Sequence, residues 1–232
     1  ERPVSYEQMI KAMDEAGIEK SAVVQASTCY GHDNSYLAEA VAAHPDRFTG
    51  VFSADVLAGN GPERIRYWVS KGLTGLRLFT VGSTMTTQSN WLEDPRTFPS
   101  WKTAQELNIP MCLQVRVPGL AMVHSLVARF PKVRVIIDHL MSPEMEDGPP
   151  YAKAAPLFEL AKYPNVHLKL TSNSVRAAKK GNATPETFFA KLVGEFGSSR
   201  IVWGSNYPAS TGTLKEILDE SKAALAALPA KD

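Results

Sequence analysis

Polar side chains follow two of the apolar runs in this sequence and could do chemistry there. Residues 200–208 read RIVWGSNYP, so an apolar run ends in Gly204 and Ser205 and is followed by the amide of Asn206. An amide can orient water or donate to a developing oxyanion, a contribution of about 3 kcal/mol in other enzymes. His139 closes the run VRVIIDH, and histidine titrates near neutral pH. The sequence therefore predicts catalytic roles for His139 and Asn206.

Further polar residues lie inside or directly after other apolar runs. Arg77 lies within LTGLRLF and Lys169 lies between two leucines, so each cation must be paired with an acid or must bind an anionic substrate. Gln114 ends the run MCLQ, and His32 follows SAVVQAS by a few residues. We predict substrate-binding roles for Arg77, His32, Gln114 and Lys169, with an internal ion pair as the alternative for both cations.

Two aspartates have structural alternatives. Asp138 precedes His139, and successive strand residues point to opposite faces, so we expect Asp138 to face the helices as a hydrogen-bond acceptor. Asp33 either belongs to a site or caps a helix that begins at Ser35.

The metal question stays open at this level. No spaced cluster of His, Cys or Asp resembles a complete metal site, and His139 is the single candidate ligand. Zinc or manganese is therefore the alternative cofactor, and no cofactor is certain. The sequence also lacks the G-x-S-x-G elbow of α/β-hydrolases.

Short apolar runs rich in Val, Ile and Leu are typical of strands buried on both faces. They predict seven strands, at 21–27, 48–55, 73–80, 110–116, 133–140, 166–172 and 200–206. Amphipathic segments with caps and stops predict eight helices between and around them. These are 5–17, 35–44, 61–72, 98–108, 119–130, 154–163, 184–197 and 212–228.

The order is one helix followed by seven strand–helix repeats, which indicates a parallel sheet. No strand is followed by G-x-G-x-x-G, and the period is uniform, so we predict a single (β/α)8 TIM-type barrel domain over 1–232. Because a barrel needs eight strands, we expect the first strand to lie upstream and the chain to be incomplete at its N-terminus, and at its C-terminus as well. An eighth strand within 81–97 is disfavoured, because that stretch is polar and turn-rich.

Composition is ordinary for a soluble globular protein, with 44% hydrophobic and 21% charged residues. The formal net charge of +1 gives no basic footprint for nucleic acid, and no apolar run has the length of a membrane span. Cys29 and Cys112 are expected to be buried free thiols of a cytoplasmic protein, with a catalytic Cys29 as the weaker alternative. The unpaired edges of a seven-stranded barrel would favour a homo-oligomer.

The chain resembles the barrel-type amidohydrolase-related (amidohydrolase 2) proteins, which include 2-pyrone-4,6-dicarboxylate hydrolase and sugar lactonases. The resemblance covers nearly the whole chain and rests on GLTGLRLF, VRVIIDHLMSP, PNVHLKLTSNS, RIVWGSNYPAS and the segment from MDEAG to FTGV at 13–51. It implies a (β/α)8 barrel that hydrolyses a carboxylated lactone or a related ring. It also implies that His139 is the family histidine, that Arg77 meets a substrate carboxylate, and that Asn206 occupies a position usually held by aspartate.

The asparagine at 206 shifts the expected chemistry. An aspartate there could deprotonate water, whereas an amide cannot, so His139 becomes the leading base and hydrolysis without a metal is favoured. Two alternatives stay open, both on the same barrel: a metal-dependent decarboxylase or hydratase, and a catalytically impaired barrel that binds a small anion.

Overall fold

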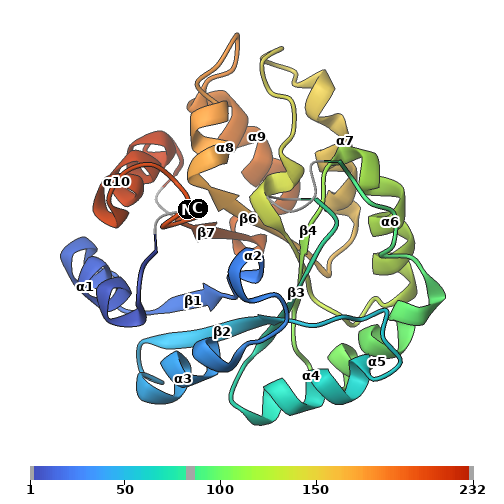
Figure 1. Cartoon of the computed structure of the whole chain (residues 1–232). Coiled ribbons are helices and arrows are strands. Elements are labelled where there is room, and N and C mark those ends of the chain that lie inside the picture. Colours follow the sequence, from blue (N-terminus) through green and yellow to red (C-terminus); the bar gives the residue numbers. More distant parts are fainter. Residues whose placement is uncertain (1–2, 82–86, 230–232) are drawn as a thin grey trace. The chain divides into compact units, whose positions relative to one another are not determined.

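The computed structural model describes residues 3–81 and 87–229, and these form two compact units. The first, residues 19–136, is called the amino-half unit below. The second, residues 1–18 together with 137–232, is called the carboxy-half unit. Figure 1 labels the α-helices and most of the strands of both units.

Parallel strands form the sheet of the amino-half unit. They are β1 (Ser21–Val24), β2 (Phe48–Ser53), β3 (Gly75–Phe79) and β4 (Met111–Gln114), and β5 (Val135–Ile137) begins at the unit's end. Each strand pairs with the next one along the chain, as short βα connections require. The helices are α2 (Ser27–Tyr30), α3 (Ser35–Ala43), α4 (Gly61–Ser70), α5 (Phe98–Glu106) and α6 (Leu120–Arg129).

The register of this sheet places three predicted positions on one face. In the parallel register, Ser53 of β2 lies opposite Arg77 of β3, and Arg77 lies opposite Cys112 of β4. Gln114 lies two residues beyond Cys112, so its side chain shares the face of Arg77. The carboxyl ends of β2, β3 and β4 therefore present Ser53, Arg77 and Gln114 together.

The carboxy-half unit contains the parallel pair β6 (Val166–Thr171) and β7 (Ile201–Gly204). Its helices are α1 (Tyr6–Ala16), α7 (Ala155–Phe158), α8 (Ser172–Ala177), α9 (Pro185–Phe196) and α10 (Leu214–Leu225), and α1 and α10 pack together (Figure 1). Ser5 and Gln8 form the predicted capping box of α1, and Thr213 and Glu216 form a second one at α10. In β6, Val166, Leu168 and Leu170 are buried, while Lys169 between them is only partly exposed.

The fold class is confirmed: seven parallel strands alternate with helices, as in the β/α repeats of a TIM-type barrel. All seven strands and all eight helices are found, mostly shortened by one to three residues at an end. Segment 154–163 is helical only in part, because α7 continues as a 3-10 turn over Glu159–Lys162. The sequence did not predict α2 and α8. α8 follows β6 directly, and α2 begins three residues after the last residue of β1.

The sequence also predicts that the stretch 81–97 contains no strand and that both cysteines are buried. Residues 88–94 contain no helix or strand and Pro95–Thr97 is a 3-10 turn, while 82–86 of the stretch 81–97 lie outside the described residues. Cys112 is a buried free thiol as predicted, but Cys29 is exposed, because it lies on the short helix α2 rather than in β1. In the described part of the chain, no helix is both long and apolar enough to cross a membrane.

Candidate active site

A left-handed backbone turn follows β5 in the carboxy-half unit. Four successive residues without glycine, His139 to Ser142, have φ between 51° and 60°, and the amide of Ser142 donates to the carbonyl of His139 over 2.9 Å. For L-residues such a turn costs about 1–2 kcal/mol per residue, and strain of this kind concentrates at functional sites. The turn therefore marks His139 independently of its residue type.

The turn directs two neighbouring side chains to the same strand. The Asp138 carboxylate pairs with Lys169 Nζ at 2.5 Å, and His139 Nδ1 lies 3.0 Å from Thr171 Oγ1. Lys169 and Thr171 are two residues apart in β6 and so share one face of it. The expectation that Asp138 and His139 point to opposite sides is wrong, because the backbone leaves the strand conformation at His139 and the alternation of faces ends there.

Lys169 is held as a nearly buried cation. Its side chain is 19% exposed and that of Asp138 is fully buried, so this is an internal ion pair, the alternative that the sequence left open. A Cβ atom on Gly204 would lie 3.1 Å from Cδ and 3.2 Å from Cγ of Lys169, closer than ordinary contact. The glycine in WGSN thus leaves room for the lysine stem to cross β7.

Asn206 also lies in a strained position, with φ of 54°, just beyond β7. Its amide nitrogen donates to Ser210 Oγ at 3.0 Å, and Ser210 Oγ lies 2.7 Å from Ser172 Oγ. Ser172 directly follows Thr171, the residue that contacts His139. The end of β6 therefore connects both predicted catalytic residues through hydrogen-bond contacts, and the two share one unit.

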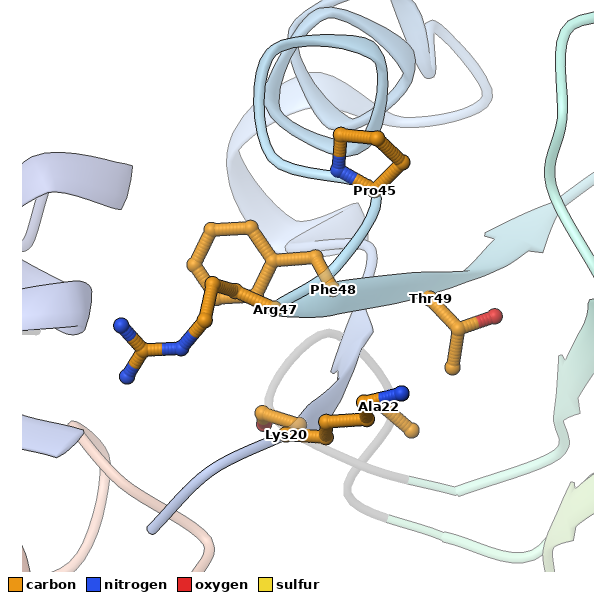
Figure 2. A pocket seen from close by; sticks show the side chains of 7 residues that line it. Lys20, Ala22, Pro45, Arg47, Phe48 and Thr49 are labelled. Atoms are coloured by element: carbon orange, nitrogen blue, oxygen red, sulfur yellow. The ribbon is translucent and has the colours of Figure 1, made fainter. Parts of the chain in front are cut away.

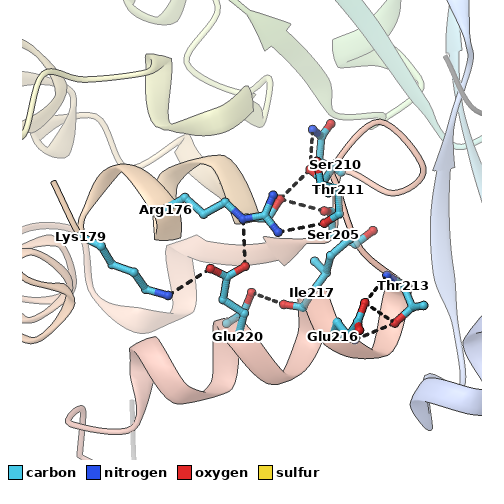
Figure 3. Close-up of polar contacts among 12 residues, drawn as sticks. Arg176, Lys179, Ser205, Ser210, Thr211, Thr213, Glu216, Ile217 and Glu220 are labelled. Carbon is cyan, nitrogen blue, oxygen red and sulfur yellow. Dashed lines mark hydrogen bonds and ion pairs between the residues drawn. The ribbon is translucent and has the colours of Figure 1, made fainter.

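A charged clamp fixes the loop that carries Asn206 (Figure 3). Arg176 of α8 donates to the carbonyl of Thr211 and to the Glu220 carboxylate of α10, each at 2.9 Å. Lys179 adds a second bond to Glu220 at 3.0 Å. Burial acts to raise the pKa of Glu220, but the hydrogen bonds from Lys179 and Arg176 outweigh it and lower the pKa below its usual value.

The clamp predicts a pH-dependent contribution to stability. A carboxylate with a lowered folded-state pKa stabilises the fold above its unfolded pKa, and the gain is lost as pH falls through the folded value. Glu220→Gln should lower Tm by about 2–4 °C at pH 7 and by less at pH 3. Thermal unfolding across this range checks it, with Glu195→Gln in the surface pair Lys191–Glu195 as control. A deficit for Glu220→Gln that is unchanged at pH 3 would show that charge is not its cause.

In the amino-half unit, a hydrogen-bonded network holds the loop after β1. Asn34 is fully buried, donates to the carbonyls of His32 and Ser53, and accepts from the Ser53 amide at 2.9 Å. Asp33 accepts from the amide and hydroxyl of Ser35 at 3.0 and 2.6 Å. These bonds, chiefly that from the Ser35 hydroxyl, lower the pKa of Asp33. Asp33 thus bonds the first residue of α3, but it lies one residue before the N-cap position of that helix, which is Asn34.

The same network sets the tautomer of His32. Ser53 Oγ donates to the Gly31 carbonyl at 2.9 Å and lies 3.2 Å from His32 Nδ1. Because the hydroxyl has one hydrogen, Nδ1 must carry the proton, and Nε2 is the acceptor in the neutral ring. Removal of part of the His32 ring from water lowers the pKa of the imidazole below its usual value. The nearby Asp55 carboxylate acts to raise this pKa, and Arg64 acts to lower it further.

Arg77 and Gln114 are joined on the same sheet face. The Gln114 side-chain oxygen accepts a hydrogen bond from the Arg77 guanidinium, and Arg77 is half-buried. An amide oxygen orients the guanidinium without neutralising its charge. The arrangement fits the predicted role of Arg77 as the group that meets an anion.

The described residues do not fit a resident divalent metal. Among residues 3–81 and 87–229, no three His, Cys, Asp or Glu side chains come together as ligands. His139 contacts Thr171 through Nδ1, and Asn206 is an amide, a poor zinc ligand. The catalytic roles are therefore assigned to side chains of this chain alone.

A hollow of about 280 Å³ lies elsewhere, at the amino ends of β1 and β2 in the amino-half unit (Figure 2). Lys20, Ala22, Arg47 and Thr49 are among its lining residues. In parallel α/β folds this end contributes to stability, and chemistry takes place at the carboxyl ends of strands. The hollow is therefore not the candidate site.

The structure brings the predicted residues together in two groups. Contacts within the carboxy-half unit link His139, Lys169 and Asn206. Two pairs lie at strand ends of the amino-half unit, namely Arg77 with Gln114 and His32 with Ser53. Sequence reasoning missed Ser172 and Ser210. Both are small polar residues close to predicted strand ends, which is the signal that could have drawn attention to them.

Comparison with known proteins yields one family. A sequence model of the family described as "Amidohydrolase" matches residues 2–232. L-fucono-1,5-lactonase of Burkholderia ambifaria is 29% identical over 122 residues, which is 52% of this chain and 42% of the lactonase. The match thus spans less than half of that relative.

Two solved structures show the same fold. An amidohydrolase from Burkholderia multivorans with bound zinc has a TM-score of 0.81 and 20% identity, over 99% of this chain and 84% of that one. A probable 2-pyrone-4,6-dicarboxylic acid hydrolase from Acinetobacter baumannii with citric acid bound has a TM-score of 0.76 and 17% identity, over 97% and 85%. At these identities the likeness establishes the fold alone.

Proposed function

The chain belongs to the amidohydrolase family, and from this premise we propose that it hydrolyses an ester or lactone bond in a small anionic substrate. The observation that carries the proposal is the linkage of His139 and Asn206 through the end of β6, with strained backbone at both residues. The lactonase relative and the citric acid in the Acinetobacter hydrolase support a carboxylated lactone as the substrate class.

His139 is the proposed general base. It accepts a proton from the attacking water as the oxygen bonds to the carbonyl carbon, and returns it to the ring oxygen as the C–O bond breaks. Thr171, at 3.0 Å from Nδ1, holds the ring for this transfer. Positioned acid–base groups contribute about 10²–10⁴-fold to rate.

Lys169 and Asn206 are the proposed partners of the negative charge that develops on the carbonyl oxygen. Lys169 is a fixed cation, because Asp138 holds its ammonium and its stem crosses Gly204. Asn206 offers its second N–H or its Oδ1, and orients either the oxyanion or the attacking water. Fixed donors of this kind act most strongly when they need no reorganisation during the reaction.

Arg77 is the proposed binder of the substrate carboxylate, with Gln114 orienting it and His32 as a further substrate contact. Arg77→Gln should raise KM about 30-fold for a carboxylated lactone and leave KM for the corresponding neutral amide unchanged, since one charge-assisted interaction is lost. Steady-state kinetics on the two substrates check this. Arg66→Gln, which breaks a surface pair with Glu106, is the control. Equal effects on both substrates would contradict the carboxylate role.

Metal content and reaction products distinguish the proposed hydrolase from the two alternative functions predicted from the sequence. A metal-dependent decarboxylase or hydratase would carry stoichiometric zinc or manganese and release carbon dioxide or add water to a double bond. A catalytically impaired barrel would bind small carboxylates in calorimetry and turn over none of them.

A further inference from the structure

Three hydroxyl and amide contacts form a chain around Asn206 in the carboxy-half unit. Asn206 Nδ2 donates to Ser210 Oγ at 3.0 Å, Ser210 Oγ lies 2.7 Å from Ser172 Oγ, and Ser172 Oγ donates to the Ser205 carbonyl at 3.2 Å. Ser172 is fully buried and Ser210 is 5% exposed, so water gives these hydroxyls little help. Each contact therefore needs its own hydrogen.

The direction of every bond follows from the carbonyl end. The Ser205 carbonyl can only accept, so the one hydrogen of Ser172 goes to it. Ser172 then accepts from Ser210, whose one hydrogen is used in turn. Ser210 must accept from residue 206, and only an N–H of Asn206 supplies that third hydrogen.

We propose that Ser172 and Ser210 are positioning residues that select an amide over a carboxylate at position 206. They hold one N–H of Asn206 and direct its Oδ1 and second N–H elsewhere. The bond directions stand without the proposed function, and only the consequence for catalysis rests on it: residue 206 serves the site as a neutral hydrogen-bonding group.

An aspartate at 206 would disturb this chain. An ionised carboxylate only accepts hydrogen bonds, so Ser210 would donate its hydrogen to the aspartate. The 2.7 Å contact between Ser210 and Ser172 would then have no hydrogen from Ser210. Ser172 could supply one only by giving up its bond to the Ser205 carbonyl. One buried acceptor is unsatisfied in either arrangement.

A double-variant cycle in thermal unfolding tests the proposal. Asn206→Asp should lower Tm by about 3 °C, and Ser172→Ala should do the same in the wild-type background. In the Asn206→Asp background, Ser172→Ala should lower Tm no further, because it removes the oxygen that the reversed chain leaves without a hydrogen. Ser221→Ala, which removes a buried hydroxyl bonded to Ile217 at 2.8 Å, should lower Tm equally in both backgrounds. Additive effects of Asn206→Asp and Ser172→Ala would overturn the proposal.

If the Asn206→Asp variant does not fold, hydrogen exchange of the Asn206 side chain tests the proposal instead. The side-chain amide of Asn206, assigned in ¹⁵N spectra by its loss in Asn206→Ala, should exchange its hydrogen slowly. Ser210→Ala should accelerate this exchange at least about tenfold, and Ser221→Ala should leave it unchanged. Exchange that is insensitive to Ser210→Ala would overturn the proposal. Neither measurement needs turnover, so their failure and the failure of the proposed hydrolysis are separable.

Discussion

Replacing His139 with alanine should lower kcat for a carboxylated lactone by about a thousandfold and leave KM nearly unchanged. The variant removes the histidine that contacts Thr171 at the end of β6, and with it the proposed acceptor of the water proton. Positioned acid–base groups contribute about 10²–10⁴-fold, so the expected loss is in the middle of that range. Steady-state kinetics on purified protein measure it.

The control for this variant is His124→Ala, which changes a histidine on α6 in the amino-half unit. It should retain wild-type kcat and KM. A His139→Ala protein with kcat within threefold of wild type would remove His139 from the mechanism. A variant that has lost kcat and Tm together would indicate a structural role, so thermal unfolding is measured in parallel.

Neutralising Asp138 should have the largest effect on stability. Asp138→Asn keeps the shape of the side chain but leaves the Lys169 ammonium, 19% exposed, without its carboxylate partner. Breaking one side of a buried ion pair costs about 3–5 kcal/mol, and partial exposure of Lys169 places this pair at the lower end. For a chain of this size, about 3 kcal/mol corresponds to a fall in Tm of about 6–12 °C.

Two further variants show whether the missing charge is the cause. Asp138→Asn combined with Lys169→Met should recover part of the lost Tm, because no buried charge is then left uncompensated. Asp219→Asn breaks the exposed pair with Lys215 on α10 and should shift Tm by less than about 2 °C. If Asp138→Asn is no less stable than Asp219→Asn, the pair does not hold the site together.

The strands and helices could be predicted because their signals are local. Runs of Val, Ile and Leu mark β3, β5 and β6, and Ser5 with Gln8 marks the start of α1. The residue types of His139, Asn206 and Arg77 could also be matched to strand ends, where parallel folds place chemistry. Residue type and a local pattern sufficed for all of these.

The left-handed turn could not be predicted in the same way. Residues 139–142 read HLMS, with no glycine to indicate positive φ, and β-strand alternation gave the wrong face for Asp138. The turn exists because contacts distant in sequence, Lys169 with Asp138 and Thr171 with His139, offset its local strain. Such compensation is visible only in three dimensions.

The hydrogen-bond chain of Asn206 shows the same limit. Ser172 and Ser210 are 38 residues apart, and serines are common near loops, so nothing in the sequence pairs them. The sequence did indicate that an amide replaces an expected carboxylate. The structure supplies a physical reason for the amide, because only an N–H at residue 206 completes the chain.

The proposed function is hydrolysis of a carboxylated lactone with His139 as base and without a resident metal. The most direct measurement is the rate of lactone opening by protein dialysed against a chelator, with the residual zinc and manganese quantified in the same sample. We expect kcat/KM to be retained at a metal content far below one ion per chain and to be lost in His139→Ala. Activity that disappears on chelation and returns with stoichiometric zinc or manganese would contradict it.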